Sequence, residues 1–156
     1  FTEETPRVAG RHKLENVQTW ETLGGTAAIT MGTGIYETTF KVKAKQLAAA
    51  PRGFLIDLGD VRESARVYVN GVYAGCAWSV PFVLTTEAVH EGTNTIRIEV
   101  TNLPANRIAD LDRRGVQWRK FNEINLVNIH YKKTTYANWE PMKSGLKSDV
   151  KLWLME

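Results

Sequence analysis

The chain has 156 residues, of which 43% are hydrophobic and 24% charged, and its net charge is +3. These values are typical of one globular domain with a sizeable core, and the single cysteine, Cys76, excludes an internal disulfide. The apolar runs are too short to span a bilayer and the basic residues form no block, so we expect no membrane partner and no nucleic-acid partner.

The first 16 residues are polar, contain Pro6 and Gly10, and are predicted to form a lead-in segment (1–16) before one domain over residues 17–156. The chain begins with Phe1 rather than Met, without a charged-then-apolar leader. We therefore expect that it comes from a longer protein and that any targeting signal lies outside this sequence.

The first half of the domain alternates as strands do. A short strand is predicted over 17–23, a better one over 34–43, and a single helical turn after it that ends before Pro51. In the segment 34–43, one face carries the side chains that we expect to be half-buried, namely Tyr36, Thr38, Phe40 and Val42. A further strand over 54–60 buries Phe54, Ile56 and Leu58.

The next segment, 65–78, contains the clearest turn signal. Asn70-Gly71 predicts a type I′ hairpin, because both central residues of that turn need positive φ. If simple alternation continues along the return strand, Val72, Ala74 and Cys76 face inward, and Cys76 packs as a small apolar side chain. Pro81 ends the pairing.

Two strands near the end complete the set, over 94–102 and 149–155. The second points Val150, Leu152 and Leu154 inward, so Trp153 faces the other way, toward a neighbouring domain or the lead-in segment. Strands of this number with frequent turns predict an all-β fold, an antiparallel β-sandwich of jelly-roll type. The region 103–148 is long, polar and unperiodic. Apart from a possible strand over 124–131, we expect it to lie folded over the sandwich without regular structure.

Several segments carry a family resemblance that covers the chain from about residue 17 to its end. "GTGIYETTFKV", "DLGDVRESARVYVNG" and "NTIRIEVTN" occur in this order and resemble the galactose-binding-like sandwich of glycoside hydrolases, in particular the sugar-binding domain of family 2 glycosidases. The tail that begins "NLPANRIADLDRRG" is more specific, and resembles the C-terminal end of family 106 α-L-rhamnosidases.

This resemblance implies a galactose-binding-domain-like, non-catalytic accessory domain that needs no cofactor. Its partners would be carbohydrate and the catalytic domain of the same parent chain, which would be periplasmic or secreted by bacteria. The catalytic carboxylates of such enzymes belong to another domain, so none is assigned here. A purely structural spacer that supports the catalytic barrel without binding sugar is the alternative.

Sugar binding needs aromatic faces together with planar donors and acceptors. The residues that we select for it are Trp78, Arg107, Asp112, Arg114, Trp118 and Trp139. Each tryptophan also has a structural interpretation, which is that Trp78 closes the end of the core and that Trp118 and Trp139 anchor the long loop. A binding test with alanine variants separates the two interpretations.

The acidic residues leave further alternatives open. Asp110 and Asp112 could hold Ca²⁺ or contact sugar hydroxyls, but their spacing matches no EF-hand loop, and ion pairs with Arg107, Arg113 or Arg114 are the favoured interpretation. For catalysis within the chain, two carboxylates would have to face each other across a cleft. No spacing selects such a pair among Glu63, Asp110, Asp112 and Glu123.

Overall fold

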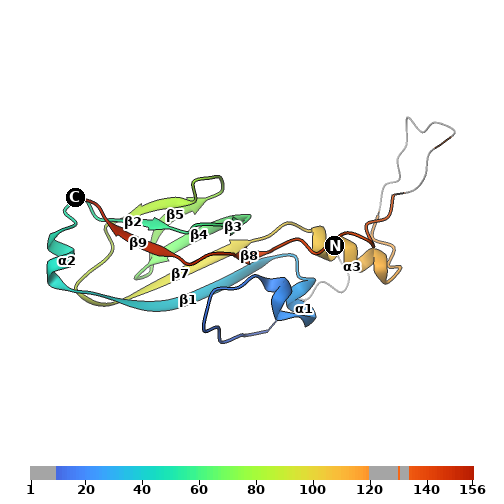
Figure 1. Cartoon of the computed structure of the whole chain (residues 1–156), viewed down its shortest axis with the longest axis horizontal. Coiled ribbons are helices and arrows are strands. Elements are labelled where there is room, and N and C mark those ends of the chain that lie inside the picture. Colours follow the sequence, from blue (N-terminus) through green and yellow to red (C-terminus); the bar gives the residue numbers. More distant parts are fainter. Residues whose placement is uncertain (1–9, 120–129, 131–133) are drawn as a thin grey trace.

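The computed structural model describes residues 10–119, 130 and 134–156, and the protein is built mainly of antiparallel strands (Figure 1). Most of the predicted strand 124–131 and the candidate Glu123 lie outside the described residues. The boundary between a lead-in segment and a domain at residue 17 stays a prediction, although Val17 already packs against the core.

The larger sheet has four strands in the order β1-β7-β4-β5, and these span Thr33–Val42 (β1), Gly92–Thr101 (β7), Ser64–Val69 (β4) and Val72–Ala77 (β5). β1 and β7 pair along their whole length, from Thr33 opposite Thr101 to Val42 opposite Gly92. The predicted strands at 34–43 and 94–102 and the hairpin at Asn70-Gly71 are therefore confirmed. The turn residues have the positive φ values expected, 50° and 80°.

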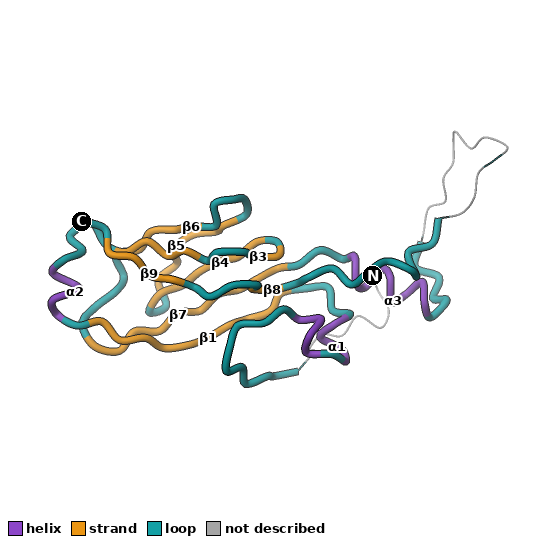
Figure 2. The backbone as a smooth tube through the Cα atoms, in the orientation of Figure 1, coloured by secondary structure: helices purple, strands orange, loops and turns teal. Residues whose placement is uncertain are grey.

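The opposing layer consists of smaller sheets (Figure 2). One has the order β6-β2-β9, with strands Val83–Thr86 (β6), Phe54–Asp57 (β2) and Lys151–Leu154 (β9), and the other pairs Val61–Arg62 (β3) with Gly145–Leu146 (β8). The predicted strands at 54–60 and 149–155 are both present, each shortened. The fold is the predicted antiparallel β-sandwich.

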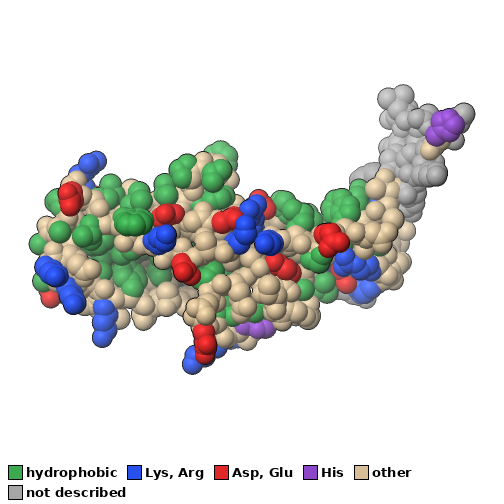
Figure 3. Space-filling view, in the orientation of Figure 1, with side chains coloured by type: hydrophobic (Ala, Val, Ile, Leu, Met, Phe, Trp, Pro, Cys, Tyr) green, Lys and Arg blue, Asp and Glu red, His purple; other side chains and the backbone are tan. Residues whose placement is uncertain are grey.

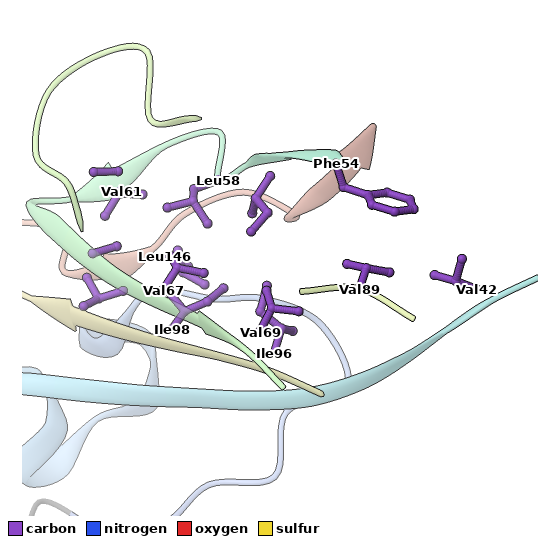
Figure 4. Close-up of a cluster of buried hydrophobic side chains, with 14 of the residues drawn as sticks. Val42, Phe54, Leu58, Val61, Val67, Val69, Val89, Ile96, Ile98 and Leu146 are labelled. Carbon is purple, nitrogen blue, oxygen red and sulfur yellow. The ribbon is translucent and has the colours of Figure 1, made fainter. Parts of the chain in front are cut away.

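The core lies between these layers, and Figure 4 shows side chains from both pointing toward one another. Ile56 and Leu58 come from one layer, Val67 and Val69 from the other, and all four are fully buried. Each such side chain contributes about 1.5–3 kcal/mol by leaving water, so this apolar contact is the main force holding the sheets together.

Helical elements occupy the ends of the sandwich: Trp20–Leu23 (η1, a 3₁₀ helix), Gly25–Ala28 (α1), Ala44–Ala48 (α2) and Ala105–Arg113 (α3). α2 is the predicted helical turn. The predicted strand 17–23 is wrong, since η1 lies there. Within 17–23, the Thr22 amide and hydroxyl both bond to the Thr19 carbonyl oxygen, which closes a tight turn that a strand could not form.

Trp20 anchors this end and explains why two glycines surround it. Its indole donates to the Tyr36 hydroxyl at 2.7 Å, and that hydroxyl accepts from the Leu146 amide at 3.1 Å. A Cβ atom at Gly34 or at Gly145 would collide with the Trp20 side chain. The indole is therefore clamped between β1 and β8, on opposite sides of the sandwich.

A β-bulge changes the faces of β5. Tyr68 pairs with Tyr73 but Val67 pairs with Gly75, so Ala74 is an extra residue and the alternation shifts by one. Ala77 is consequently buried, while Cys76 is exposed. The prediction that Cys76 packs inward is wrong for this reason. So is the alternative in which Trp78 closes the core, because Trp78 is 75% exposed.

Two further expectations need correction. Leu154, predicted to face inward, is exposed at the end of the edge strand β9, as is Trp153. The region 103–148, predicted to lack regular structure apart from one strand, contains the helix α3 and the strand β8. Pro104 immediately before α3 was the available signal, since a proline fixes φ near the helical value and suits the start of a helix.

Candidate functional site

α3 extends from the end of β7 and lies beyond the sheets (Figure 1). Its inward face buries Ala105, Asn106, Arg107, Ala109 and Leu111. The Asn106 amide donates to the Met142 carbonyl oxygen at 2.7 Å, and its side-chain oxygen accepts from the Met142 amide at 2.8 Å. This reciprocal pair fixes the returning chain against the helix.

Asp110 pairs with two arginines, one on α3 and one directly after it. Its carboxylate accepts from Arg107 at 2.9 Å and from Arg114 at 3.1 Å, at the i, i+3 and i, i+4 spacings that bring side chains together on a helix. The predicted structural ion pairs are therefore present at Asp110. The Arg107 side chain is only 2% exposed, so its place in the site is to support the helix from within.

Asp112 organises the segment that follows the helix. One carboxylate oxygen accepts from the Trp118 indole at 2.6 Å, and the other accepts from the Tyr136 amide at 2.7 Å and the Thr135 hydroxyl at 3.4 Å. Burial alone would raise the pKa of Asp112, but the hydrogen bonds from Tyr136 and Trp118 and the nearby Arg119 outweigh burial, and the pKa lies below its ordinary value.

Three aromatic side chains lie next to one another near this carboxylate. The Trp118 and Tyr136 ring centroids are 6.1 Å apart, and those of Tyr136 and Trp139 are 4.5 Å apart, both in tilted arrangements. The Arg119 guanidinium lies 5.1 Å from the Trp118 centroid and 5.0 Å from the Tyr136 centroid, which is cation–π distance. We call Asp112, Trp118, Arg119, Tyr136 and Trp139 the aromatic cluster.

The end of the cluster is held by α3 and is open to solvent. The Arg113 guanidinium donates to the carbonyl oxygens of Ala137 at 2.8 Å and Trp139 at 2.9 Å. Trp139 is nevertheless 45% exposed. Trp139 is thus fixed through its backbone while part of the residue stays accessible, and a sugar ring stacks on an accessible aromatic ring that is held in place.

Four of the six sequence-predicted site residues thus lie on α3 or in the aromatic cluster, namely Arg107, Asp112, Trp118 and Trp139, and a fifth, Arg114, directly follows α3. Trp78 does not, because it belongs to the connection between β5 and β6, which lies over the sheets well away from α3 (Figure 2). Sequence reasoning missed Arg119 and Tyr136. The neighbouring Trp118-Arg119 pair was a weak signal for the first, and no spacing pointed to the second.

The rest of the described surface shows mixed charges. In Figure 3, side chains of both signs are interspersed along the visible face. Within the described ranges, no group of three or more His, Cys, Asp or Glu side chains is placed to hold a metal ion. No helix in the described part of the chain is long and apolar enough to cross a membrane.

Comparison with known proteins finds similarity to short parts of much longer proteins. No family model matches the sequence. A protein of Formosa agariphila named "Putative beta-glucuronidase" is 32% identical in an alignment of length 138, and the match covers 78% of this chain and 12% of that protein. A rhamnosidase structure from Novosphingobium sp. PP1Y is 30% identical with a TM-score of 0.62. The match covers 81% of this chain and 11% of the rhamnosidase chain.

A third similar structure is a β-glucuronidase of Bifidobacterium dentium, 22% identical with a TM-score of 0.48. The match covers 53% of this chain and 14% of the glucuronidase chain. The chain therefore spans only about an eighth or less of the first two relatives, both named as glycosidases. Its similarity is to one β-sandwich part of glycoside hydrolases.

Proposed function

We propose that this protein is a non-catalytic, carbohydrate-binding accessory domain of a larger glycoside hydrolase, of the galactose-binding-like jelly-roll kind. The observation that carries the proposal is the pair of relatives that match most of this chain with only 11–12% of their own length. A match of this shape is expected for a module that accompanies a separate catalytic unit.

The aromatic cluster supports sugar binding. Trp139, which is partly exposed, offers an aromatic ring for the apolar face of a pyranose, and the exposed Arg114 offers a planar donor near the end of α3. Hydrogen bonds from Arg113 and to Asp112 fix the segment before any ligand arrives, which lowers the entropy cost of binding. Trp78, with its exposed ring, is a second, separate contact.

The same geometry argues against Asp112 as the catalytic acid of a glycosidase. A glycosidase acid needs a raised pKa so that it carries a proton at working pH. Asp112 has a lowered pKa and both of its oxygens accept hydrogen bonds. We assign the catalytic carboxylates to another part of the parent enzyme, which acts on plant or host glycans and is periplasmic or secreted.

The alternative function, a structural domain that docks on the catalytic unit without touching sugar, is favoured by a different surface. Trp153 and Leu154 are both exposed at the end of the edge strand β9. An exposed apolar edge of this kind is suited to contact with a neighbouring domain.

Affinity electrophoresis in gels that contain plant polysaccharides tests the proposal. We expect the wild-type chain to be retarded, Trp139→Ala to migrate freely or nearly so, and Trp78→Ala to be partly released. Trp153→Ala is the matched control, because it removes an exposed tryptophan from outside the site. Wild-type migration that is unaffected by every polysaccharide would favour the docking function.

A further inference from the structure

The outer face of the four-stranded sheet carries a row of charged and aromatic side chains that lies apart from the aromatic cluster. Glu37 on β1 pairs with Arg97 on β7, Arg97 pairs with Tyr68 on β4, and Tyr68 pairs with Tyr73 on β5. The neighbours of Arg97 and Tyr68 along their strands are buried, so this row points away from the core. It therefore crosses all four strands on the face turned away from β2 and β9 (Figure 1).

A hollow of about 730 Å³ lies over this row. It is lined by Glu37, Thr39, Tyr68, Thr95, Arg97 and Glu99, among others. Its volume lies within the range of small-ligand sites, about 300–1,000 Å³. The lining is a mixture of an aromatic ring, threonine hydroxyls, carboxylates and a guanidinium, which is the mixture that recognises hydroxyl-rich ligands.

The charges in the hollow are held in a fixed arrangement. Arg97 lies 2.8 Å from Glu99 and 3.7 Å from Glu37, and Arg66 lies 3.4 Å from Glu99. Exposed ion pairs contribute little to stability, so the fold gains little from this network. The network does hold planar donors and acceptors in place at the floor of an open hollow, where vicinal hydroxyl groups can bond to both kinds.

The aromatic part of the row is equally well placed. The Tyr68 and Tyr73 rings are 5.3 Å apart at their centroids and inclined by 51°. Tyr73 is 54% exposed. The pair supports Tyr68 beside Arg97, and a sugar ring lying on Tyr68 would have its hydroxyl edge directed to the arginine and the carboxylates.

We propose that this face is a second glycan-binding site, and that its ligand is a neutral oligosaccharide lying across the strands. The lining holds Arg97, Glu37 and Glu99, and Arg66 pairs with Glu99 from outside the lining, so this ion-pair network sums to zero charge and an acidic sugar gains no net attraction here. The class of ligand rests on the proposed function. The site itself does not, because it shares no residue with the aromatic cluster or with Trp78.

Amide chemical-shift mapping of the ¹⁵N-labelled 156-residue chain tests this proposal. The neutral probes are galactotetraose, cellotetraose and L-rhamnose, and the acidic probe is tetragalacturonate. We expect a neutral probe to shift amides around Thr39, Tyr68 and Arg97. Arg97→Ala and Tyr68→Ala should each weaken that binding by about tenfold or more, whereas Tyr68→Phe, which keeps the ring, should bind nearly as wild type.

Lys41→Ala is the matched control, since Lys41 is an exposed residue on β1 outside the lining of the hollow. Shifts confined to residues 112–119 and 134–140 would overturn this proposal while supporting the proposed function. Shifts confined to the sheet face would support it and remove the aromatic cluster as a sugar site. No shift with any probe would count against both, and tighter binding of tetragalacturonate would overturn the assignment of a neutral ligand.

Discussion

Asp112 is the residue on which the order of the aromatic cluster depends. Replacing it with alanine leaves the Trp118 indole and the Tyr136 amide without their acceptor, and both lie in partly buried surroundings. Loss of such bonds costs about 1–3 kcal/mol. We expect Asp112→Ala to lower the free energy of unfolding in urea by that amount, and Asp149→Ala, at an exposed carboxylate, to change it little. Equal stability of the two variants would contradict the role given to Asp112.

The lowered pKa of Asp112 predicts that the aromatic cluster is sensitive to acid. The pKa of Asp112 is lowered in the folded protein, so its stabilising contribution is complete above the ordinary aspartate value of about 3.9 and is lost as pH falls through the folded value. The pKa of Asp60 is lowered as well, first by its hydrogen bond to Lys147. Stability should therefore fall below about pH 4, and Asp112→Asn should flatten this fall. A variant whose acid sensitivity matched that of wild type would refute this explanation.

At the scale of elements, the bulge in β5 decides which side chains reach solvent. We expect Cys76 to react with a thiol reagent in the native state as fast as in urea, because the bulge turns it outward. Simple alternation predicts the opposite, a thiol that reacts only on unfolding. Labelling that required denaturant would show that the pairing of Val67 with Gly75 is wrong.

The close packing of Trp20 between β1 and β8 gives a second prediction about the elements. Gly34→Ala places a methyl group against the indole, and overpacking of a filled site costs about 1–3 kcal/mol. We expect thermal unfolding to shift down for this variant, with little change for Thr38→Ala, an exposed position on the same strand. Unchanged melting of Gly34→Ala would mean that Trp20 is not held between β1 and β8.

Across the whole molecule, period-two burial predicted the sandwich because its central strands obey it: Ile96, Ile98 and Val100 all face the core. The failures have local causes. A single extra residue, Ala74, reversed the faces after Tyr73, and the isolated Gly75 that follows it, with a φ of 142°, was the available signal for the bulge. In the candidate site, the tryptophans could be chosen from the sequence, but the contact of Asp112 with Tyr136 joins residues 24 apart and depends on the path of the returning chain.

The claim that this domain binds carbohydrate for a larger enzyme is tested most directly by isothermal titration of the purified chain with rhamnose, galactose and a panel of plant glycans. We predict millimolar or tighter binding of at least one of them, weakened about tenfold or more by Trp139→Ala and unchanged by Trp153→Ala. Absence of heat with every glycan, or glycoside cleavage by the chain alone, would contradict the account.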